Sequence, residues 1–587
     1  MSAWTTASDA TQAASCSRST TPSKLFRKVK NSPYKPLTLL RHLTPRRSRF
    51  SVVLALYFAL SVLVPNLVLS VTENYSLWST EALILMPAGF YLMWSVLLRR
   101  SGIMIWLGFP FIFFAAFQIV LLYLFGNSII ATDMFTNVIT TNPGEATELL
   151  GNIYPAVILV AVMYLPMLWL AWREIACRRY LSRKARKIVL LTGGILFACG
   201  ALALWPASQG RSLGEVLKKE IFPLNVSYNI YLSGSEFRKT MRFEESSADF
   251  RFDGHRTAAC EGRELYLYVI GEASRAMNWQ LFGYERETTP RLCQIEDLIR
   301  FDKVLTQSNT THKSVPLLLS SVGTDEHEEL YRRRGLPALL REAGFETWFL
   351  SNQSRQGAMI DHLSQDAEHC RYLDNPRHDL QLLEALQEIV ATSRAEKLFV
   401  ILHCYGSHFS YHQRYPRSAA HFRPDADVAI RPRHKEELRN SYDNSIRYTD
   451  TFLAETVAFL RSQTDLCSAL LYCSDHGEDL YDDRRGRFLH ASPTTTAYQL
   501  HVAAFGWFSE RYRKAFPAKV AAAAANSVCA TTTHSMYHTI ADIASVEGAY
   551  CKRSVSLVSE EFDRTAPLRY LNDHNEAVPF TETGLNA

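Results

Sequence analysis

Five apolar runs lie within the first 206 residues, and they constrain the fold more than any other feature of the sequence. They occupy residues 51–71, 80–98, 103–124, 152–172 and 188–206. Each has roughly 20 residues, the length of a helix that crosses the hydrocarbon core of a bilayer. Although 47% of the chain is hydrophobic, its mean hydropathy is only −0.08, which agrees with a membrane part joined to a more polar part. We therefore predict five transmembrane helices.

The lysines and arginines of the connecting loops follow an alternating pattern. They are concentrated in the N-terminal tail, the 99–102 loop and the 173–187 loop, whereas residues 72–79 and 125–150 contain none. Because cytoplasmic loops carry an excess of Lys and Arg, we expect the N-terminus in the cytoplasm and residues 207–587 on the other side of the membrane. A set of buried core helices would not explain this pattern.

The organisation predicted from these features has four parts. They are a basic cytoplasmic tail (1–50), a transmembrane domain of five helices (51–206), a bridging linker or helix (207–255) and an exported domain (256–587). About 50 residues precede the first run, so we do not interpret it as a cleaved signal peptide. The net charge of +5 does not indicate a nucleic-acid partner, because many basic residues serve the membrane orientation and the others are dispersed.

Short apolar runs alternate with helical patterns in the exported part. The predicted strands are 264–272, 345–353, 397–408, 468–478 and 498–509, and the predicted helices include 335–343 and 436–462. Near-continuous apolar strands separated by helices are typical of a mostly parallel sheet that is covered on both faces. An exported domain permits disulfides, but the spacing of its eight cysteines does not give their pairing. We expect Cys404 and Cys473, inside apolar strands, to be buried free thiols.

Carboxylates and imidazoles follow several of these strands. Glu272 ends the first strand, His403 lies near the end of the third, and Asp475 and His476 follow the fourth. Ligand sites of open α/β sheets lie at the carboxyl ends of the strands. These side chains are also the ligand types that zinc takes in catalytic sites. The interpretation of His403 as a core histidine is preferred over that of a ligand.

The segment LTQSNTTHKSVPLLLSS, residues 305–321, raises the question of a nucleophile. Thr310 or Thr311 could simply cap a helix that starts here. If residues 311–320 form a helix, however, Thr311 lies at its N-terminus, where the backbone N–H groups favour an anion such as phosphate. A hydroxyl bound to zinc also loses its proton more easily and becomes a better nucleophile.

Together these motifs resemble the phosphoethanolamine transferases that modify bacterial lipopolysaccharide. These are zinc enzymes of the alkaline phosphatase and sulfatase superfamily. The motif YVIGEASR resembles the family's first metal motif and implies Glu272 as a ligand, and SDHGEDL implies Asp475 and His476. TTHKSVP aligns with the nucleophile segment and implies that Thr311 is both nucleophile and metal ligand. The implied fold is a sulfatase-like α/β domain on the periplasmic side of a five-helix membrane domain.

The resemblance also implies substrate contacts. It places His408 of LHCYGSH and His490 of RFLHASP near the bound head group, and Lys313 is a candidate for contact with phosphate. The loop NVITTNPGE keeps the spacing of family residues that contact the donor lipid, here Asn137, Thr141 and Glu145. The implied cofactor is one firmly bound zinc ion, with room for a second and weaker ion. The implied location is the bacterial inner membrane.

The implied reaction moves phosphoethanolamine from phosphatidylethanolamine to lipopolysaccharide. The acceptor stays open among lipid A phosphate, core heptose, Kdo and a periplasmic glucan, and so does polymyxin resistance. Ser308 and Leu317 stand where lipid A-modifying members carry a cysteine pair, and the segment looks closer to members that modify core sugars.

The sequence also allows a comparison with three other kinds of protein. A glycerophosphate transferase of the same superfamily would use phosphatidylglycerol and manganese. A sensor or scaffold would need no intact ligand set. An arylsulfatase would need a C-x-P-x-R segment, which the sequence lacks. Separately, His534 and His538 have the i, i+4 spacing of metal ligands, but we interpret them as part of a surface helix that packs on the sheet.

Overall fold

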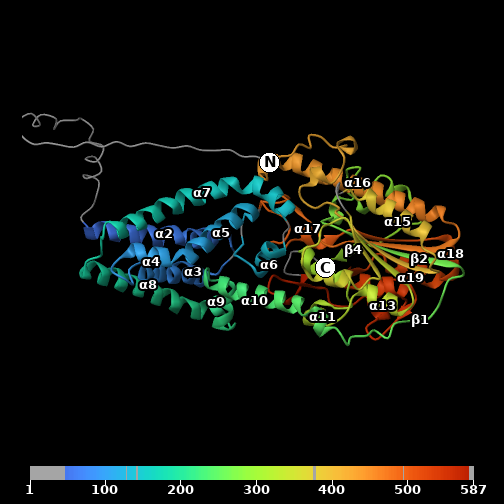
Figure 1. The fold of residues 1–587 in the computed structure, drawn as a ribbon, viewed down its shortest axis with the longest axis horizontal. Helices are drawn as coiled ribbons and strands as arrows, with labels where there is room; N and C mark the ends of the chain where they lie inside the picture. The colour runs from blue at the N-terminus through green and yellow to red at the C-terminus, as the bar shows by residue number, and fades with distance from the viewer. Residues whose placement is uncertain are drawn as a thin grey trace, which may run out of the picture.

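The computed structural model describes residues 47–580 except 74, 127, 141–142, 374–377, 485 and 494. The molecule is elongated, with a bundle of long helices at one end and an α/β domain at the other (Figure 1). The bundle comprises α2 (Arg47–Thr72), α3 (Leu77–Ser95), α4 (Ser101–Leu107), α5 (Phe109–Phe125), α7 (Pro143–Ala176) and α8 (Arg183–Ser208). Helices therefore occupy all five predicted apolar positions.

The predicted number of five spans is not confirmed. Among the described residues, α2, α7 and α8 are long and apolar enough to cross a membrane. The helices α4 and α5 meet at an angle of 59° and make a fourth span only if they count as one broken helix. The 19-residue α3, whose first turns carry Ser79 and Glu81, is not among these candidate spans. It nevertheless packs tightly on α8, since Gly89 and Gly193 let the two backbones approach closely.

The segment 125–150, expected to be a loop, contains helical structure. It includes α6 (Thr132–Thr140) and the first turns of α7. Next along the chain from α8, α9 (Leu213–Lys219), α10 (Leu224–Met241) and α11 (Phe243–Ser246) lead to the α/β domain. The side chains of Asn225 and Asn229 on α10 both donate to the backbone carbonyl of Ile130, so α10 is fixed to the segment before α6.

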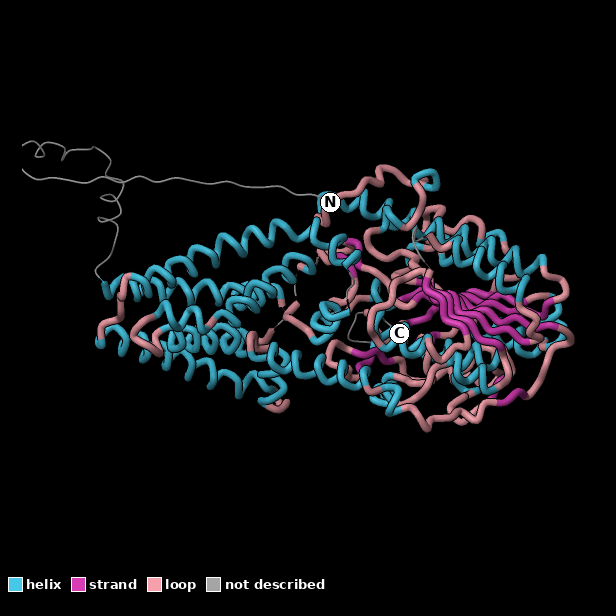
Figure 2. Tube along the Cα trace, viewed as in Figure 1, coloured by secondary structure: helices cyan, strands magenta, loops and turns pink. Residues whose placement is uncertain are grey.

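The α/β domain is built on a seven-stranded sheet, the magenta strands of Figure 2. In sheet order, its strands are β3 (Ile299–Arg300), β12 (Ala504–Phe508), β8 (Leu466–Ser474), β2 (Arg263–Gly271), β7 (Lys397–His403), β5 (Glu346–Ser351) and β6 (His369–Tyr372). The strands from β8 to β6 are mutually parallel, as expected. However, β12 is antiparallel to both of its neighbours, so the sheet is mixed.

Helices cover both faces of this sheet. The face lined by Leu265, Leu267 and Val269 of β2 packs against α15 (Leu380–Thr392) and α16 (Lys435–Ser462). The opposite face packs against α12 (Thr311–Leu318), α13 (Leu336–Glu342) and α20 (His534–Ile543). The predicted helices 335–343 and 436–462 are thus confirmed as α13 and α16. Burial of nearly every residue of β2 and β8 explains why these strands read as continuous apolar runs.

The cysteines beyond residue 250 include one disulfide, Cys260–Cys467, which spans 207 positions of the sequence. It joins the segment before β2 to the second residue of β8, at the start of both central strands. Cys404 and Cys473 are buried and unpaired, as expected.

Candidate active site

The register of the parallel strands brings the predicted ligands together. Gly271 of β2 pairs with Ser474 of β8, so the next residues, Glu272 and Asp475, leave the sheet at the same level. Glu272, Asp475 and His476 are completely buried, and one ligand atom of each lies within 4.8 Å of the others. His476 Nε2 lies 3.4 Å from a Glu272 oxygen and 3.5 Å from an Asp475 oxygen.

Thr311 faces this cluster. It is the first residue of α12, and its Oγ1 lies 3.0 Å from His476 Nε2 and 3.2 Å from Glu272 Oε1. The capping position is taken by Thr310, whose side chain makes no capping hydrogen bond to α12. Of the two threonines, therefore, one occupies the helix cap and the other turns its hydroxyl to the carboxylates and the imidazole.

The three buried groups perturb one another strongly. Burial, and then the neighbouring Glu272 carboxylate, raise the pKa of Asp475 to about 7. Burial alone would raise the pKa of Glu272, but hydrogen bonding and attraction from His476 lower it instead. Burial would lower the pKa of His476, yet Asp475 and Glu272 raise it to about 10. Two carboxylates and an imidazole, buried at ligand distance, fit a divalent cation that would neutralise them.

Hydrogen bonds from neighbouring side chains fix these carboxylates. Ser314 Oγ, one turn along α12 from Thr311, donates to Asp475 Oδ2 over 2.9 Å. Gln353, which follows β5, donates from Nε2 to Glu272 Oε2 over 2.9 Å. Neither role was predicted from the sequence. Ser314 lay three residues from the expected nucleophile, but no sequence pattern indicated Gln353.

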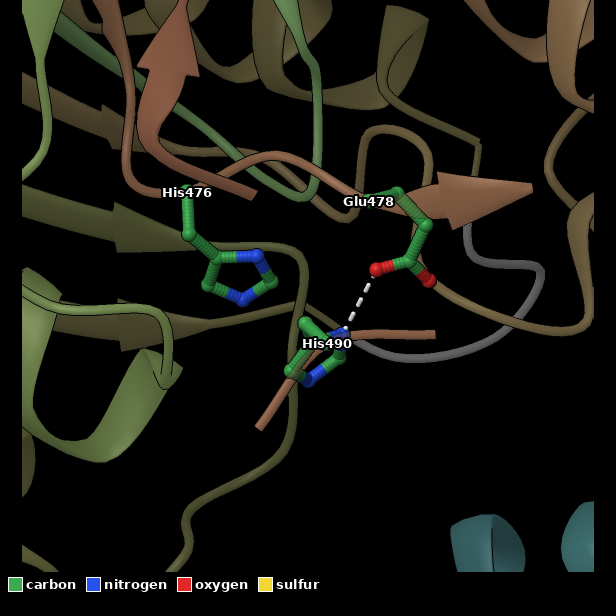
Figure 3. Close-up of side chains that lie close together, drawn as sticks. All are labelled: His476, Glu478 and His490. Atoms are coloured by element: carbon green, nitrogen blue, oxygen red, sulfur yellow. Dashed lines mark hydrogen bonds and ion pairs between the residues drawn. The ribbon is translucent and has the colours of Figure 1, made fainter. Parts of the chain in front are cut away.

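A second group of ligand-type side chains adjoins the first. Figure 3 shows His476, Glu478 and His490 converging, with ligand atoms within 4.8 Å of one another. His490 Nδ1 bonds to Glu478 Oε2 over 2.8 Å, and the rings of His476 and His490 lie 4.0 Å apart. The other oxygen of Glu478 accepts from Tyr411 over 2.8 Å. Glu478 was part of the recognised motif but was not expected as a site residue.

His408 lies beside this second group. Its ring centroid is 6.4 Å from that of His490, and its Nδ1 bonds to the Phe409 carbonyl. The ring also stacks on Tyr405 at 5.2 Å. His408 and His490 therefore border the cluster around Thr311.

Other candidates lie elsewhere. Lys313 forms an ion pair with Asp133 of α6, 2.5 Å away. Thr141 lies outside the described residues, and so do the side chains of Asn137 and Glu145. His403 is buried in β7 and bonds through Nδ1 to Ser351, which agrees with its interpretation as a core residue.

The pair in α20 belongs to a helix that packs on the sheet, as predicted, but this helix is mostly buried rather than on the surface. His534 and His538 are hydrogen-bonded to each other through Nε2, and His534 contacts the Ser321 carbonyl. They belong to neither of the two ligand groups found among the described residues.

Comparison with known proteins shows which families this chain resembles. The sulfatase family profile matches residues 264–546, and the profile described as phosphoethanolamine transferase EptA/EptB matches residues 111–233. The chain is therefore similar to the phosphoethanolamine transferase family, as its motifs indicated. As predicted, it is therefore an enzyme of the transferase class.

Two curated relatives are similar to this chain over about two thirds of its length. Kdo(2)-lipid A phosphoethanolamine 7''-transferase of Salmonella typhimurium is 28% identical over 425 residues, which cover 66% of this chain and 72% of the relative. Phosphatidylethanolamine transferase Mcr-1 of Escherichia coli is 27% identical over 407 residues, or 64% and 73% of the two chains.

Solved structures support the same fold. The integral membrane protein lipooligosaccharide phosphoethanolamine transferase A of Neisseria meningitidis superposes with a TM-score of 0.68 at 20% identity. The match covers 87% of this chain and 98% of that one, so the membrane and α/β parts are both shared. The periplasmic domain of Escherichia coli EptC, solved as a complex with zinc, matches with a TM-score of 0.50 at 22% identity over 56% and 96% of the chains.

Proposed function

We propose that this chain transfers phosphoethanolamine from phosphatidylethanolamine to lipopolysaccharide, with Thr311 as the nucleophile. The observation that carries the proposal is the position of the Thr311 hydroxyl, 3.0 Å from His476 Nε2 and 3.2 Å from Glu272. The names of the curated relatives, which include a lipid A phosphoethanolamine transferase and a phosphatidylethanolamine transferase, support the two substrates.

The proposed metal ligands are Glu272, Thr311, Asp475 and His476, and the proposed ion is zinc. Mixed carboxylate and imidazole ligands are typical of catalytic zinc sites. A bound zinc ion would lower the pKa of the threonine hydroxyl and offset negative charge on the phosphoryl oxygens. The group of His476, Glu478 and His490 is the proposed position of a second, weaker ion.

In the first half-reaction, a bond forms between Thr311 Oγ1 and phosphorus while the bond from phosphorus to the glycerol oxygen breaks. The threonine loses its proton and the departing diacylglycerol gains one. In the second half, an acceptor oxygen forms the new bond to phosphorus and Thr311 leaves with a proton. Dividing one displacement into two is the general benefit of covalent catalysis.

The side chains around Thr311 suit these steps. The nearby N-terminus of α12 supplies backbone N–H groups that favour the phosphoryl oxygens. Because Glu478 holds His490 through Nδ1, the Nε2 atom of His490 remains for the substrate. His408 and His490 are thus proposed to contact the phosphoethanolamine group.

The proposed setting is the bacterial inner membrane, with the N-terminus in the cytoplasm and the α/β domain in the periplasm. The alternation of basic loops supports this orientation. It places the active site on the membrane face where phosphatidylethanolamine and newly exported lipopolysaccharide meet.

Mass spectrometry of lipopolysaccharide, divided into lipid A and core, tests the proposal. Cells that express the wild type should show a phosphoethanolamine increment on one fragment, and cells that express Thr311→Ala should lack it. Thr310→Ala is the matched control, because it removes the adjacent threonine hydroxyl and should retain the increment. An increment in the Thr311→Ala cells, or none with the wild type, would refute the proposal.

A further inference from the structure

A cleft of about 560 Å³ lies between the membrane helices and the α/β domain. We call it the basic cleft and define it by Tyr123, Pro155, Arg431, Arg433, Tyr481 and Gly486, which are among its lining residues. Tyr123 is near the end of α5 and Pro155 is in α7, whereas the other four residues come from the α/β domain. In Figure 1 the ends of α5 and α7 abut this domain.

Among the residues that the structure describes, the arginines of the basic cleft have no acidic partner. No carboxylate of the described residues forms an ion pair with Arg431 or Arg433. Arg433 is exposed and donates through Nε to His434, while the buried Nε of Arg431 has no hydrogen-bond partner within the described chain. The nearby Asp482 is already engaged by Arg275, 2.6 Å away. Two guanidinium groups are therefore available to an anion. A planar guanidinium can donate two parallel hydrogen bonds to the oxygens of a phosphate.

A short hairpin connects the basic cleft to the candidate active site. It pairs β9 (Asp479–Leu480) with β10 (Phe488–Leu489). Glu478 and His490 lie immediately outside the two strands, at the active site, while Tyr481 and Gly486 lie at the tip and line the cleft. Tyr481 lies three positions after Glu478, and three steps of extended chain correspond to about 10 Å. The membrane helix α5 packs on β10 and supports this hairpin.

The basic cleft also lies at the level expected for the membrane surface. The apolar helix α5 ends at Phe125, and the aromatic ring of Tyr123 in its last turn is more than one-third exposed. Tyr and Trp are enriched where membrane helices meet water. A ligand in the cleft would therefore belong to the head-group layer of the bilayer rather than to its hydrocarbon core.

From this geometry we propose that the basic cleft binds a phosphate group of the acceptor glycolipid. The inference rests on the proposed function and adds a specificity site to it. The donor's phosphorus must reach Thr311, so the donor cannot place the same phosphate in a cleft about 10 Å from the Glu478 group. A multiply phosphorylated acceptor can reach Thr311 and the cleft at the same time. One of its oxygens reacts while another phosphate, further along the sugar, binds Arg431 and Arg433.

The test uses the full-length protein in vesicles that contain phosphatidylethanolamine as donor. Initial rates are measured against the concentration of intact lipopolysaccharide and of dephosphorylated lipopolysaccharide. In the Arg431→Ala/Arg433→Ala variant, the KM for the intact acceptor should rise about tenfold, as for the loss of charge-assisted contacts, with an unchanged maximal rate. The KM for the dephosphorylated acceptor should already be high in the wild type and should not change.

Two further variants separate phosphate binding from general effects. Arg332→Ala/Arg394→Ala removes the same charge from exposed positions outside the cleft and should leave both KM values unchanged. Arg431→Lys/Arg433→Lys keeps the charge and should recover part of the affinity. An equal rise of KM for the intact and dephosphorylated acceptors would overturn the inference.

Binding measurements distinguish a failure of this inference from a failure of the proposed function. The wild type could transfer nothing and yet bind intact lipopolysaccharide about tenfold more tightly than Arg431→Ala/Arg433→Ala does. That result would support the phosphate site in the cleft and refute the proposed reaction. If transfer occurs and the variant binds as the wild type does, the cleft assignment fails alone. The cleft assignment would also be overturned if phosphatidylglycerol vesicles competed for binding as well as intact lipopolysaccharide does. The cleft would then bind anionic lipid in general.

Discussion

Lys313 of α12 and Asp133 of α6 form a buried ion pair that joins the α/β domain to the membrane part. Their Nζ and Oδ1 atoms lie 2.5 Å apart, and the two side chains are only 4% and 5% exposed. His312 Nε2 lies 3.5 Å from the same Asp133 oxygen. Since Thr311 precedes these two residues on α12, the contact ties the position of the proposed nucleophile to α6.

Removal of one partner of this pair should destabilise the protein. Lys313→Ala leaves the Asp133 carboxylate buried without its cation, a change that costs about 3–5 kcal/mol for buried pairs. We expect a lower Tm and slower transfer. The measurement is thermal unfolding of the purified protein in detergent, together with initial rates.

The exposed pair of Lys219 and Glu576 provides the control. Its atoms lie 2.7 Å apart, but the carboxylate is 47% exposed, so Lys219→Ala should change stability by at most about 1 kcal/mol. Replacement of both buried partners by apolar residues, as in Asp133→Leu/Lys313→Met, should restore much of the Tm. Equal Tm values for Lys313→Ala and Lys219→Ala would contradict the structural role of the pair.

Metal removal should affect stability as well as transfer. Without a cation, the buried carboxylates of Glu272 and Asp475 must share protons with His476, and this conflict raises the free energy of the folded state. A chelator should therefore lower the Tm and abolish transfer, and added zinc should restore both.

The metal content of variants provides a direct check. Glu272→Gln should reduce the zinc bound per chain, whereas Glu264→Gln, a buried carboxylate at the opposite end of β2 that pairs with Arg256, should not. Elemental analysis of the purified proteins measures the difference. Identical zinc contents in the two variants would exclude Glu272 as a ligand.

The hydrogen bonds behind the carboxylates should tune metal affinity. Ser314→Ala removes the donor to Asp475 Oδ2, and Gln353→Leu removes the donor to Glu272 Oε2. Loss of such supporting contacts typically weakens metal binding about 10–100-fold. Competition with a chromogenic chelator measures the affinity. Ser320→Ala, a buried serine just beyond α12, should retain the wild-type affinity, and an equal affinity in all three variants would argue against the supporting role.

Much of this site could be predicted from the sequence because its parts are local. Glu272, Asp475 and His476 each follow a strongly apolar strand, and parallel strands bring such ends together. Thr311 was ambiguous between cap and nucleophile, and only the three-dimensional position of its hydroxyl separates the two. Gln353 could not be found, since its role depends on the order of β5 and β7 in the sheet.

The differences in the fold also have physical reasons. The direction of β12 follows from how the chain returns to the sheet, and burial of its residues on both faces gives the same apolar pattern in either direction. The number of spans is undecided because α3 carries polar residues and α4 and α5 meet at a bend. Lys313 was expected near phosphate because of its neighbours in sequence, but its ion-pair partner Asp133 is 180 positions away in α6.

The buried His327 should make the stability of the protein depend on pH. His327 is 5% exposed, and burial, together with the nearby Lys313, lowers its pKa from 6.5 to about 3. The unfolded chain therefore binds a proton between these values and the folded protein does not, so stability falls as the pH decreases below 6.5. One such group contributes about 1.4 kcal/mol for each pH unit in this window. His327→Gln should therefore lose less Tm than the wild type between pH 6.5 and pH 5. The exposed His369 supplies the control, since His369→Gln should keep the wild-type dependence. If all three proteins lose the same Tm on acidification, His327 is not neutral in the folded state.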